Sequence, residues 1–404
     1  MIQGRFNALL KYVTAGESHG KGLIGVIEGL PAGVPVSEAS INAQLARRQK
    51  GYGRGGRMKI ESDRAEIMSG VRGGLTLGSP LSFIIYNRDY ENWQEIMSPG
   101  HCERLEERTV ERPRPGHADL AGAMKYNHRD MRNILERASA RETAARVAMG
   151  SICSQLLQSF DIYIYSQVIS IGSISAVPRI VDAGNLKEVC DAIEASPVRC
   201  ADVQSGEAMM ALIDSAKQEG ESLGGSFELG VLGVPPGLGS HVSWDTKLDG
   251  RIAGALTSIP AIKAVEIGEG FANAARPGSQ VHDQIFLNDE KRIYHQTNRA
   301  GGLEGGITNG ETVWARAYMK PIPTLYKPLQ TVNTREWQGE KAVVERSDIC
   351  AVPAAAVVGE AMLAFVMAQA FLEKFGSDHV GEIIESWQRY HAYLKKEWQW
   401  EKRT

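Results

Sequence analysis

The chain has 404 residues, a formal net charge of −3 at pH 7 and a hydrophobic content of 43%, values typical of a globular protein and not of a disordered or fibrous one. The small net charge argues against a nucleic acid or a membrane as partner. We find no apolar run of the about 18 residues that a bilayer requires and no signal peptide, so we expect a cytoplasmic location. The five cysteines are scattered and show no CxxC spacing, so the sequence predicts neither a disulfide framework nor a zinc site.

The first informative block is the pentapeptide Gly-Glu-Ser-His-Gly at residues 16–20. A short apolar run at 23–28 follows it and is bounded by glycines, which predicts a strand. The segment Gly-Leu-Pro-Ala-Gly at 29–33 then predicts a turn. A second strand is expected at 81–86.

Residues 47–59 form a glycine-rich loop that holds six basic residues and no acidic one. Its Gly-x-Gly-x-x-Gly spacing matches a dinucleotide fingerprint, but it follows an amphipathic segment where that fingerprint requires a strand. An Arg-Gly-Gly tract can also bind single-stranded RNA, although this one is short. We favour a loop that closes over a small polyanion, because arginine binds carboxylate and phosphate in bidentate fashion. An exposed basic turn without a ligand is the remaining alternative.

A second basic cluster, Arg-Pro-Arg-Pro-Gly-His-Ala-Asp, occupies residues 112–119. Its prolines stiffen the turn that carries His117, and histidine titrates near neutrality, so the turn could hold a general acid or base. A structural or solvated histidine is the alternative. The segment 137–143 follows and leads into a helix, whose N-terminus can bind anions. That combination favours a functional role.

The second half of the chain repeats the first. The pentapeptide returns as Gly-Glu-Ser-Leu-Gly at 220–224, and the proline turn returns at 233–237. We also align Glu66 with Glu266 and Gly78 with Gly278. The repeat keeps the glycines and replaces His19 by leucine, which indicates that the turns are scaffold and that the histidine serves chemistry; coincidence between Gly- and Pro-rich turns is the alternative.

Long alanine-rich segments at 139–160 and 352–375 close the two copies and predict buried helices. We expect strands at 227–232 and 313–319 in the second copy. Between the copies, residues 161–219 form a predicted connector with a strand at 162–171 and helices at 186–195 and 208–218. A peripheral helix is expected within 376–404. The pattern predicts one α+β domain over residues 1–404, with internal copies at about 10–160 and 215–375, and not repeated βαβ units.

Three further segments of the second copy could approach a ligand. The glycine-dense loop at 298–310 and the segment Lys-Pro-Ile-Pro-Thr at 320–324 suit close contact with a flat or phosphorylated molecule. Arg346 and Asp348 precede the second apolar helix, where they are either site residues or a helix cap.

These blocks resemble the chorismate synthase family from Tyr12 to about Phe375. The matching motifs are Thr-Ala-Gly-Glu-Ser-His-Gly at 14–20, Arg-Arg-Gln-Lys-Gly-Tyr-Gly-Arg at 47–54, Arg-Pro-Gly-His-Ala-Asp at 114–119 and Ser-Ala-Arg-Glu-Thr at 139–143. The resemblance implies a β-α-β sandwich, with helices between two antiparallel sheets and an internal pseudo-duplication. It also implies a homotetramer.

The activity that the resemblance implies is the anti-1,4-elimination of phosphate from 5-enolpyruvylshikimate 3-phosphate, which gives chorismate in the shikimate pathway. Reduced FMN is required without net redox change. By motif position His19, His117 and Asp348 are the implied catalytic residues. The implied substrate contacts are Ser18, Arg48, Arg54, Arg57, Arg114, Arg141 and Arg346. The implied flavin contacts are Arg137, Ala138, Ser139, Pro260, Ala261, Gly305, Lys320, Pro321, Ile322, Pro323, Thr324 and Arg346.

Pro260 stands where many family members have Gln or Asn, so only a backbone contact with flavin is expected there. No metal is implied. Because the chain lacks a credible dinucleotide fingerprint, we expect NADPH to act indirectly, through a separate flavin reductase.

Two rival functions use the same residues. An RNA- or nucleotide-binding protein would use the Arg-Gly-Gly loop, and its binding would weaken steeply with salt and need no flavin. A phosphatase would also need no flavin, but the sequence offers no metal-ligand cluster or obvious nucleophile for one.

Overall fold

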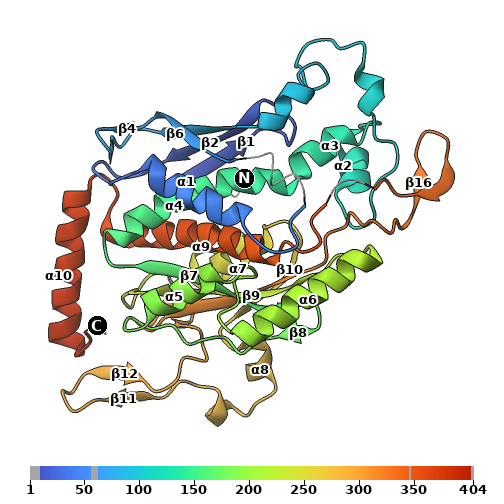
Figure 1. Ribbon diagram of the computed structural model, residues 1–404. Helices are drawn as coiled ribbons and strands as arrows, with labels where there is room; N and C mark the ends of the chain where they lie inside the picture. The colour runs from blue at the N-terminus through green and yellow to red at the C-terminus, as the bar shows by residue number, and fades with distance from the viewer. Residues whose placement is uncertain (1–9, 56–61, 345–346, 402–404) are drawn as a thin grey trace.

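Two antiparallel sheets enclose a layer of helices in the computed structural model, which describes residues 10–55, 62–344 and 347–401 (Figure 1). The first sheet has the strand order β1-β2-β6-β3 and the second the order β10-β15-β9-β7-β8. The first sheet consists of β1 (Lys11–Ala15), β2 (Gly22–Glu28), β6 (Leu81–Tyr86) and β3 (Ala65–Ser69). The second consists of β10 (Ile262–Ile267), β15 (Val313–Met319), β9 (Gly225–Leu232), β7 (Tyr163–Ile171) and β8 (Ile174–Ser175). The predicted α+β sandwich is confirmed.

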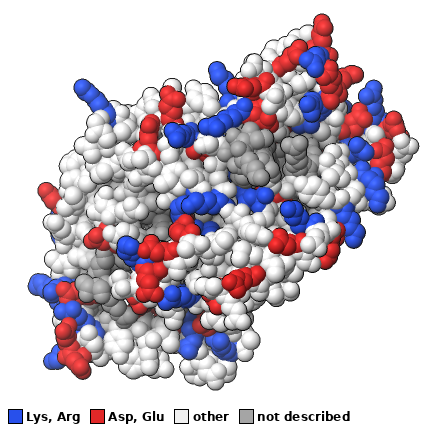
Figure 2. Space-filling model, in the orientation of Figure 1, with Lys and Arg blue, Asp and Glu red and all other residues white. Residues whose placement is uncertain are grey.

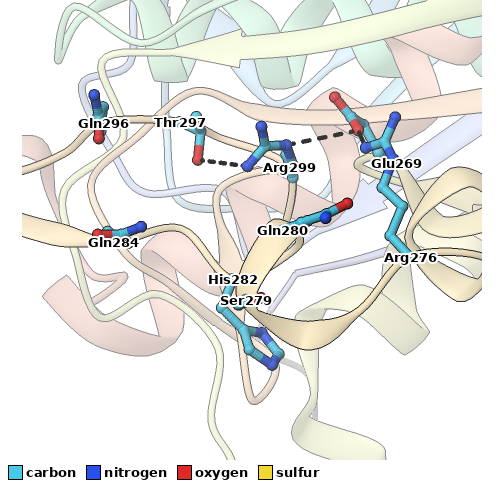
Figure 3. A pocket seen from close by; sticks show the side chains of 9 residues that line it. All are labelled: Glu269, Arg276, Ser279, Gln280, His282, Gln284, Gln296, Thr297 and Arg299. Carbon is cyan, nitrogen blue, oxygen red and sulfur yellow. Dashed lines mark hydrogen bonds and ion pairs between the residues drawn. The ribbon is translucent and has the colours of Figure 1, made fainter.

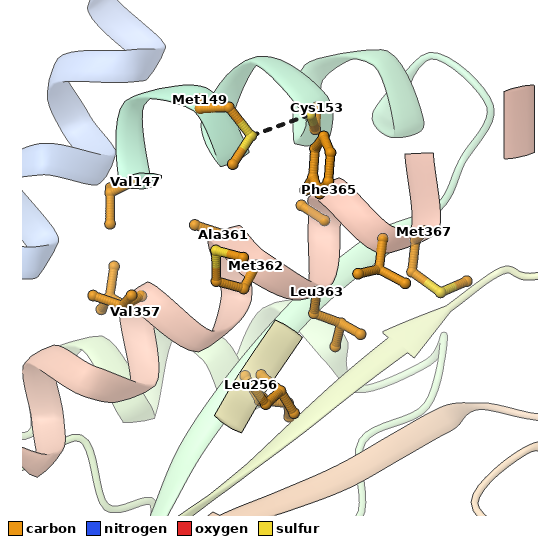
Figure 4. Packing of buried hydrophobic residues seen from close by; sticks show 14 of the residues in the cluster. Val147, Met149, Cys153, Leu256, Val357, Ala361, Met362, Leu363, Phe365 and Met367 are labelled. Atoms are coloured by element: carbon orange, nitrogen blue, oxygen red, sulfur yellow. Dashed lines mark hydrogen bonds between the residues drawn. The ribbon is translucent and has the colours of Figure 1, made fainter. Parts of the chain in front are cut away.

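The helix layer is built around α4 (Thr143–Gln158) and α9 (Val352–Phe375), with α1 (Glu38–Gln49) and α7 (Leu248–Thr257) beside them. Figure 4 shows the side chains of α4 and α9 interlocked in the core. The two axes approach closely at Gly150, where an added Cβ would lie 2.4 Å from the Cα of Ala361. Small residues are therefore required at this crossing.

α9 is predominantly apolar and almost wholly buried, because it packs on β7 and β9 of the second sheet and on α4, α1 and α7. In the part of the chain that the structure describes, it is the one helix long and apolar enough to cross a membrane, and it lies buried in the core of the protein. A helix that is hydrophobic all round suits such an interior position.

The remaining elements lie outside the sandwich. The helices are α2 (Asp119–Tyr126), α3 (Arg132–Ala138), α5 (Leu186–Ala195), α6 (Val203–Glu219), α8 (Gly270–Ala274) and α10 (Val380–Trp398). The short hairpins are β4 (Val71–Arg72) with β5 (Leu75–Thr76), β11 (Ile285–Leu287) with β12 (Ile293–His295), β13 (Leu303–Glu304) with β14 (Ile307–Thr308), and β16 (Gln330–Asn333) with β17 (Gln338–Lys341). The 3₁₀ turns are η2 (Arg88–Asn92), η3 (Leu105–Arg108), η4 (Ala140–Glu142), η5 (Trp244–Thr246) and η6 (Gly278–Gln280).

The internal repeat is visible in the topology. The order β1-β2-β6-β3 corresponds to β7-β9-β15-β10, and α4 corresponds to α9. β7, which the sequence placed in the connector, is hydrogen-bonded to β9 and is therefore part of the second sheet.

One buried threonine in each copy ties the proline turn to the glycine hairpin. Thr76 Oγ1 accepts the N–H of Val34 at 2.9 Å and donates to the carbonyl of Pro31 at 2.5 Å. Thr308 Oγ1 makes the equivalent bonds in the second copy, to Leu238 N at 2.8 Å and to the carbonyl of Pro235 at 2.7 Å. The same local geometry therefore recurs in both halves.

The structure corrects one of the sequence pairings. Residues 70–86 match residues 302–318 without a gap, and the positive-φ glycines at 70, 73, 74 and 78 recur at 302, 305, 306 and 310. Gly78 therefore corresponds to Gly310, and the pairing with Gly278 is wrong. An insertion at 268–301, which carries α8 and the β11–β12 hairpin, shifts the numbering of the second copy and explains the wrong pairing. The pairing of Glu66 with Glu266, which lies before this insertion, agrees with the strand registers.

Candidate active site

Loops from both copies converge at the end of the sandwich where α4 and α9 begin. The loop 16–20 joins β1 to β2, Asn87 follows β6, and η4 leads directly into α4. On the second sheet, residues 220–224 precede β9 and Lys320 follows β15, and Leu223 is bridged to Cys350 just before α9. Two helix N-termini at one place favour the binding of an anion. Figure 2 shows Lys and Arg side chains gathered across the middle of this face of the molecule.

A buried arginine pair forms the centre of the site. Asp63 lies between Arg48 and Arg141, with its Oδ2 3.4 Å from Arg48 Nη1 and its Oδ1 hydrogen-bonded to Arg141 Nη1. Arg48 also donates to Thr143 Oγ1 at 2.9 Å and to the carbonyl of Ala140 at 2.9 Å. All three charged side chains are almost fully buried, so the pair is held rigidly between α1 and the start of α4.

The two arginines of this cluster carry two positive charges, and Asp63 supplies one negative charge. Burial lowers the pKa of Arg48 to about 10; Asp63 opposes this fall, whereas the charges of Arg54 and Arg141 add to it. Arg54 in turn lies 3.1 Å from Asp348, whose other oxygen accepts the N–H of Gly55 at 2.6 Å. A bound anion would relieve the repulsion among the guanidinium groups. Arg57 and Arg346, which the sequence placed here, lie outside the described residues.

His19 is held by a carboxylate from another part of the chain. Its Nδ1 lies 2.8 Å from Oε1 of Glu136, and its backbone N–H donates to Oε2 at 2.8 Å. The imidazole stacks on Trp93 with a centroid separation of 4.2 Å. His19 is therefore fixed in both position and ring plane.

His117 belongs to a second histidine–carboxylate pair. Its Nδ1 lies 2.5 Å from Oδ1 of Asp119 and 3.1 Å from Arg114 Nη2, so we assign its proton to the shorter bond, with the carboxylate. Arg114 Nε also donates to Asp119 at 2.8 Å. Burial would raise the pKa of Asp119, but bonds from His117 and Arg114 outweigh it and hold that pKa far below its usual range. The turn is thus stiffened by the hydrogen bonds that Arg114 and His117 make to Asp119 as well as by proline.

The predicted flavin segment 137–139 touches the first pentapeptide. Arg137 donates through Nη2 to the carbonyl of Thr14 at 2.8 Å and through Nη1 to that of Gly16 at 3.1 Å. Ser139 Oγ lies 3.1 Å from Ser18 Oγ and accepts the N–H of Arg141 at 3.2 Å. The Arg137 guanidinium therefore braces the loop, whereas the hydroxyls of Ser18 and Ser139 adjoin the arginine cluster.

The segment 320–324 packs against the turn that carries His117. Lys320 Nζ donates to the carbonyl of Gly116 at 2.5 Å, and Arg114 Nη1 donates to Thr324 Oγ1 at 3.3 Å. The Lys320 N–H bonds Ala261, which has a φ of 69°, and Pro260 precedes it. Lys320 therefore places a positive charge beside the turn that carries His117, which suits an anionic ligand there.

Gly305 is separate from these groups. It lies in the β13–β14 hairpin, which adjoins the Val313 end of β15, whereas Lys320 follows the Met319 end. Six residue steps of strand separate the two ends by roughly 20 Å. Within one chain, Gly305 and the segment 320–324 are therefore not brought together.

A cavity of about 540 Å³ lies in the insertion at 268–301 (Figure 3). Figure 3 shows Arg276 and Arg299 directed toward Glu269. Because it adjoins the end of β10 opposite Ala261, this cavity is distinct from the arginine cluster.

Sequence reasoning missed several residues that build the site. Asp63 and Glu136 were not singled out, although both are buried partners of predicted site residues. Asn87 was also missed; it donates to the carbonyl of Gly20 at 2.7 Å and accepts from Arg141 Nε at 2.8 Å. The one available signal for Glu136 was its position directly before the segment 137–139.

A buried arginine cluster, two histidine–carboxylate pairs and two helix N-termini define an enzyme for a small, multiply charged anion. The sequence profile described as chorismate synthase matches residues 10–372. A chorismate synthase of Syntrophomonas wolfei subsp. wolfei is 63% identical over 394 residues, covering 98% of this chain and 100% of the relative. One of Moorella thermoacetica is 57% identical over 388 residues, covering 96% and 100%.

A crystal structure of a chorismate synthase superposes on the protein with a TM-score of 0.77 at 44% identity, covering 96% of this chain and 98% of that one. The chain belongs to the chorismate synthase family, whose members are lyases of the shikimate pathway. The resemblance inferred from the sequence is confirmed.

Proposed function

We propose that this protein eliminates phosphate from 5-enolpyruvylshikimate 3-phosphate to give chorismate, with reduced FMN as cofactor. The observation that carries the proposal is the buried group of Arg48, Arg141 and Asp63, which Asn87 links to the loop that holds His19. The substrate has a phosphate and two carboxylates, so it would supply the negative charge that this cluster lacks. Membership of the family implies a reduced flavin in general.

The arginines would act on both binding and bond breaking. Arg48 and Arg141 are held by Asp63 and by backbone or side-chain oxygens, so their positions are fixed before the substrate enters. Preorganised donors stabilise charge that develops in the transition state, here on the departing phosphate. Arg54 and Arg114 extend the positive surface, and His19 is placed to donate a proton to the leaving group. Ser18 lies beside them.

The flavin would lie against His117, with Lys320, Thr324 and the backbone of Ala261 as contacts. When bound, it supplies an electron transiently and takes up the C6 hydrogen of the substrate. His117 and Asp348 would hold or move protons at its edge. The carboxylate of Asp119 supports this assignment because it keeps His117 Nδ1 protonated and leaves Nε2 for exchange. The proposed contacts of Arg346 and Arg57 fall outside the described residues.

An assembly of several copies would complete the flavin site. Gly305 and the segment 320–324 lie at opposite ends of β15, so one flavin can contact both only if a second chain supplies one of them. This supports the proposed homotetramer. Mixing Gly305→Val subunits with Lys320→Ala subunits should restore part of the activity that each variant lacks alone, whereas a site contained in one chain predicts no restoration.

The two copies and the connector would form one catalytic domain, because the proposed site takes residues from both copies. Cytoplasmic location, an external flavin reductase and NADPH as its electron donor stay predictions from the sequence.

Anaerobic turnover of 5-enolpyruvylshikimate 3-phosphate, with and without reduced FMN, tests the function. We expect phosphate and chorismate to appear together and only with flavin. Equal phosphate release without flavin would refute the assignment and favour a phosphatase.

A further inference from the structure

Glu136 is a buried carboxylate that accepts hydrogen bonds from His19 and Arg132. It lies on α3, is 3% exposed and receives three donors, which are the backbone N–H of His19, its Nδ1, and Arg132 Nη1 at 3.1 Å. Because a carboxylate only accepts hydrogen bonds, Nδ1 must carry the proton in this contact. The structure thereby specifies which nitrogen of His19 is protonated when the imidazole is neutral.

Burial would raise the pKa of Glu136, but the hydrogen bond and the charge of His19, together with the charge of Arg132, outweigh it and lower that pKa. Glu136 is therefore ionised at neutral pH. A buried anion at hydrogen-bonding distance favours the imidazolium form of a histidine.

The other faces of His19 complete its surroundings. Its Nε2 lies 3.9 Å from Asp89 Oδ2, beyond hydrogen-bonding distance, and Trp93 covers the ring. Arg108 and Arg132 both lie 4.9 Å from the centroid of the Trp93 ring, which holds the indole in place. Nε2 is thus the nitrogen left for exchange with a ligand.

We propose that Glu136 is the positioning residue for His19: it fixes the Nδ1–H tautomer and stabilises the imidazolium, so that Nε2–H can protonate the departing phosphate. This inference rests on the proposed function. In the elimination, the electron pair of the C–O bond leaves with the phosphate oxygen, and the new double bond forms as C6 loses its hydrogen, which a bound flavin would accept. The Nε2 proton passes to the phosphate. The imidazole is left neutral, with Nδ1–H still bonded to Glu136.

The test compares Glu136→Gln with Glu136→Asp and with Glu142→Gln. Glutamine keeps the shape but removes the negative charge beside the imidazole, so the fall of activity at high pH should begin at a lower pH than in the unmodified protein. At pH 8 we expect kcat to fall about 10- to 100-fold, with KM changed much less, and to recover as the pH is lowered. Glu136→Asp should retain part of the charge effect.

Glu142 is the matched control, because it is also buried but bonds Arg146 at 2.7 Å and not a histidine. Glu142→Gln should leave the pH profile in place. In a His19→Ala background, Glu136→Gln should add no further loss, because the two residues act as one unit.

The outcomes separate the two hypotheses. Absence of flavin-dependent turnover in the unmodified protein would contradict the proposed function itself. Normal turnover with an unshifted profile in Glu136→Gln, or a full additional loss in the His19→Ala background, would overturn only the role of Glu136. If Glu136→Gln does not fold, the pH profile of Glu136→Asp decides, and a profile identical to that of the unmodified protein would reject the inference.

Discussion

The loop at 16–20 and the loop at 220–224 precede equivalent strands, β2 and β9, and differ in their side chains. The Ser18 N–H donates to the carbonyl of Glu136, and the Leu223 N–H donates to that of Ile349, so each loop is tied to the segment before its central helix. His19, however, faces Glu136 and Trp93, whereas Leu223 packs on the hydrophobic core. The repeated fold conserves turns, and the two copies diverge at the side chains that point into the site.

The same division holds for the rest of the proposed site. The first copy contributes Arg48, Arg141 and both histidine–carboxylate pairs, while the second contributes the segment 320–324 and Asp348. This arrangement supports a substrate side and a cofactor side within one pseudo-symmetric frame.

His19→Leu, which imports the residue of the second copy, should have the largest effect. Loss of the proton donor predicts a fall in kcat of about 10²- to 10⁴-fold. Because Glu136 loses the Nδ1–H but keeps the His19 backbone N–H and Arg132 as donors, we also expect a loss of about 1–3 kcal/mol in the free energy of unfolding. Steady-state turnover under anaerobic conditions and denaturant unfolding measure the two quantities. Leu223→His is the reciprocal control; it should destabilise the protein without adding activity. If His19→Leu were about as active as the unmodified protein, His19 could not be the proton donor to the leaving phosphate.

The cofactor side is tested by His117→Ala and Asp348→Ala. Both should slow the chemical step about 10²-fold, a typical acid–base contribution, while the protein still binds flavin. Single-turnover kinetics and flavin titration distinguish the two effects. A normal rate in His117→Ala or in Asp348→Ala would remove that residue from the mechanism.

Arg48→Ala is the corresponding test of the substrate side and should mainly raise the Kd for substrate.

Elements that depend on local pattern could be predicted from the sequence. The helices at 186–195 and 352–375 and the strands at 81–86 and 313–319 have the predicted bounds, because their apolar runs end at clear turn residues. The partners of the site were harder to foresee. Asp63 and Glu136 meet Arg141 and His19 only after loops far apart in the chain fold together, and nothing in a single carboxylate's neighbours along the chain marks it as an ion-pair partner.

The equivalent threonines test whether the two copies are also alike in energy. Thr76→Val and Thr308→Val each leave a buried N–H without its acceptor, which should cost about 1–3 kcal/mol in the free energy of unfolding. Chemical denaturation of both variants makes the comparison, with Thr331→Val, a partly exposed position, as the milder control. Similar losses at the two sites would extend the symmetry from geometry to stability, whereas a large difference would limit it to the backbone.

The smallest predicted effect concerns the ionic network that joins the copies. Arg47 of α1 lies 2.6 Å from Glu360 of α9 and 2.6 Å from Glu194, and Arg199 bonds both carboxylates. Burial would raise the pKa of Glu194, but bonds from Arg47 and Arg199 outweigh it and lower that pKa to about 2.

A carboxylate with a lowered pKa stabilises the fold at pH values above its ordinary pKa of 4.5, and that contribution is lost as the pH falls toward 2. Because Glu194 is one-third exposed, solvent screening reduces the expected contribution to about 1 kcal/mol. In Glu194→Gln, the free energy of unfolding should therefore decrease less on acidification, by about 1 kcal/mol. Denaturant midpoints at pH 3 and pH 6 measure this difference. An unchanged pH dependence would show that Glu360 alone neutralises the two arginines and that the connector adds nothing to the contact between the copies.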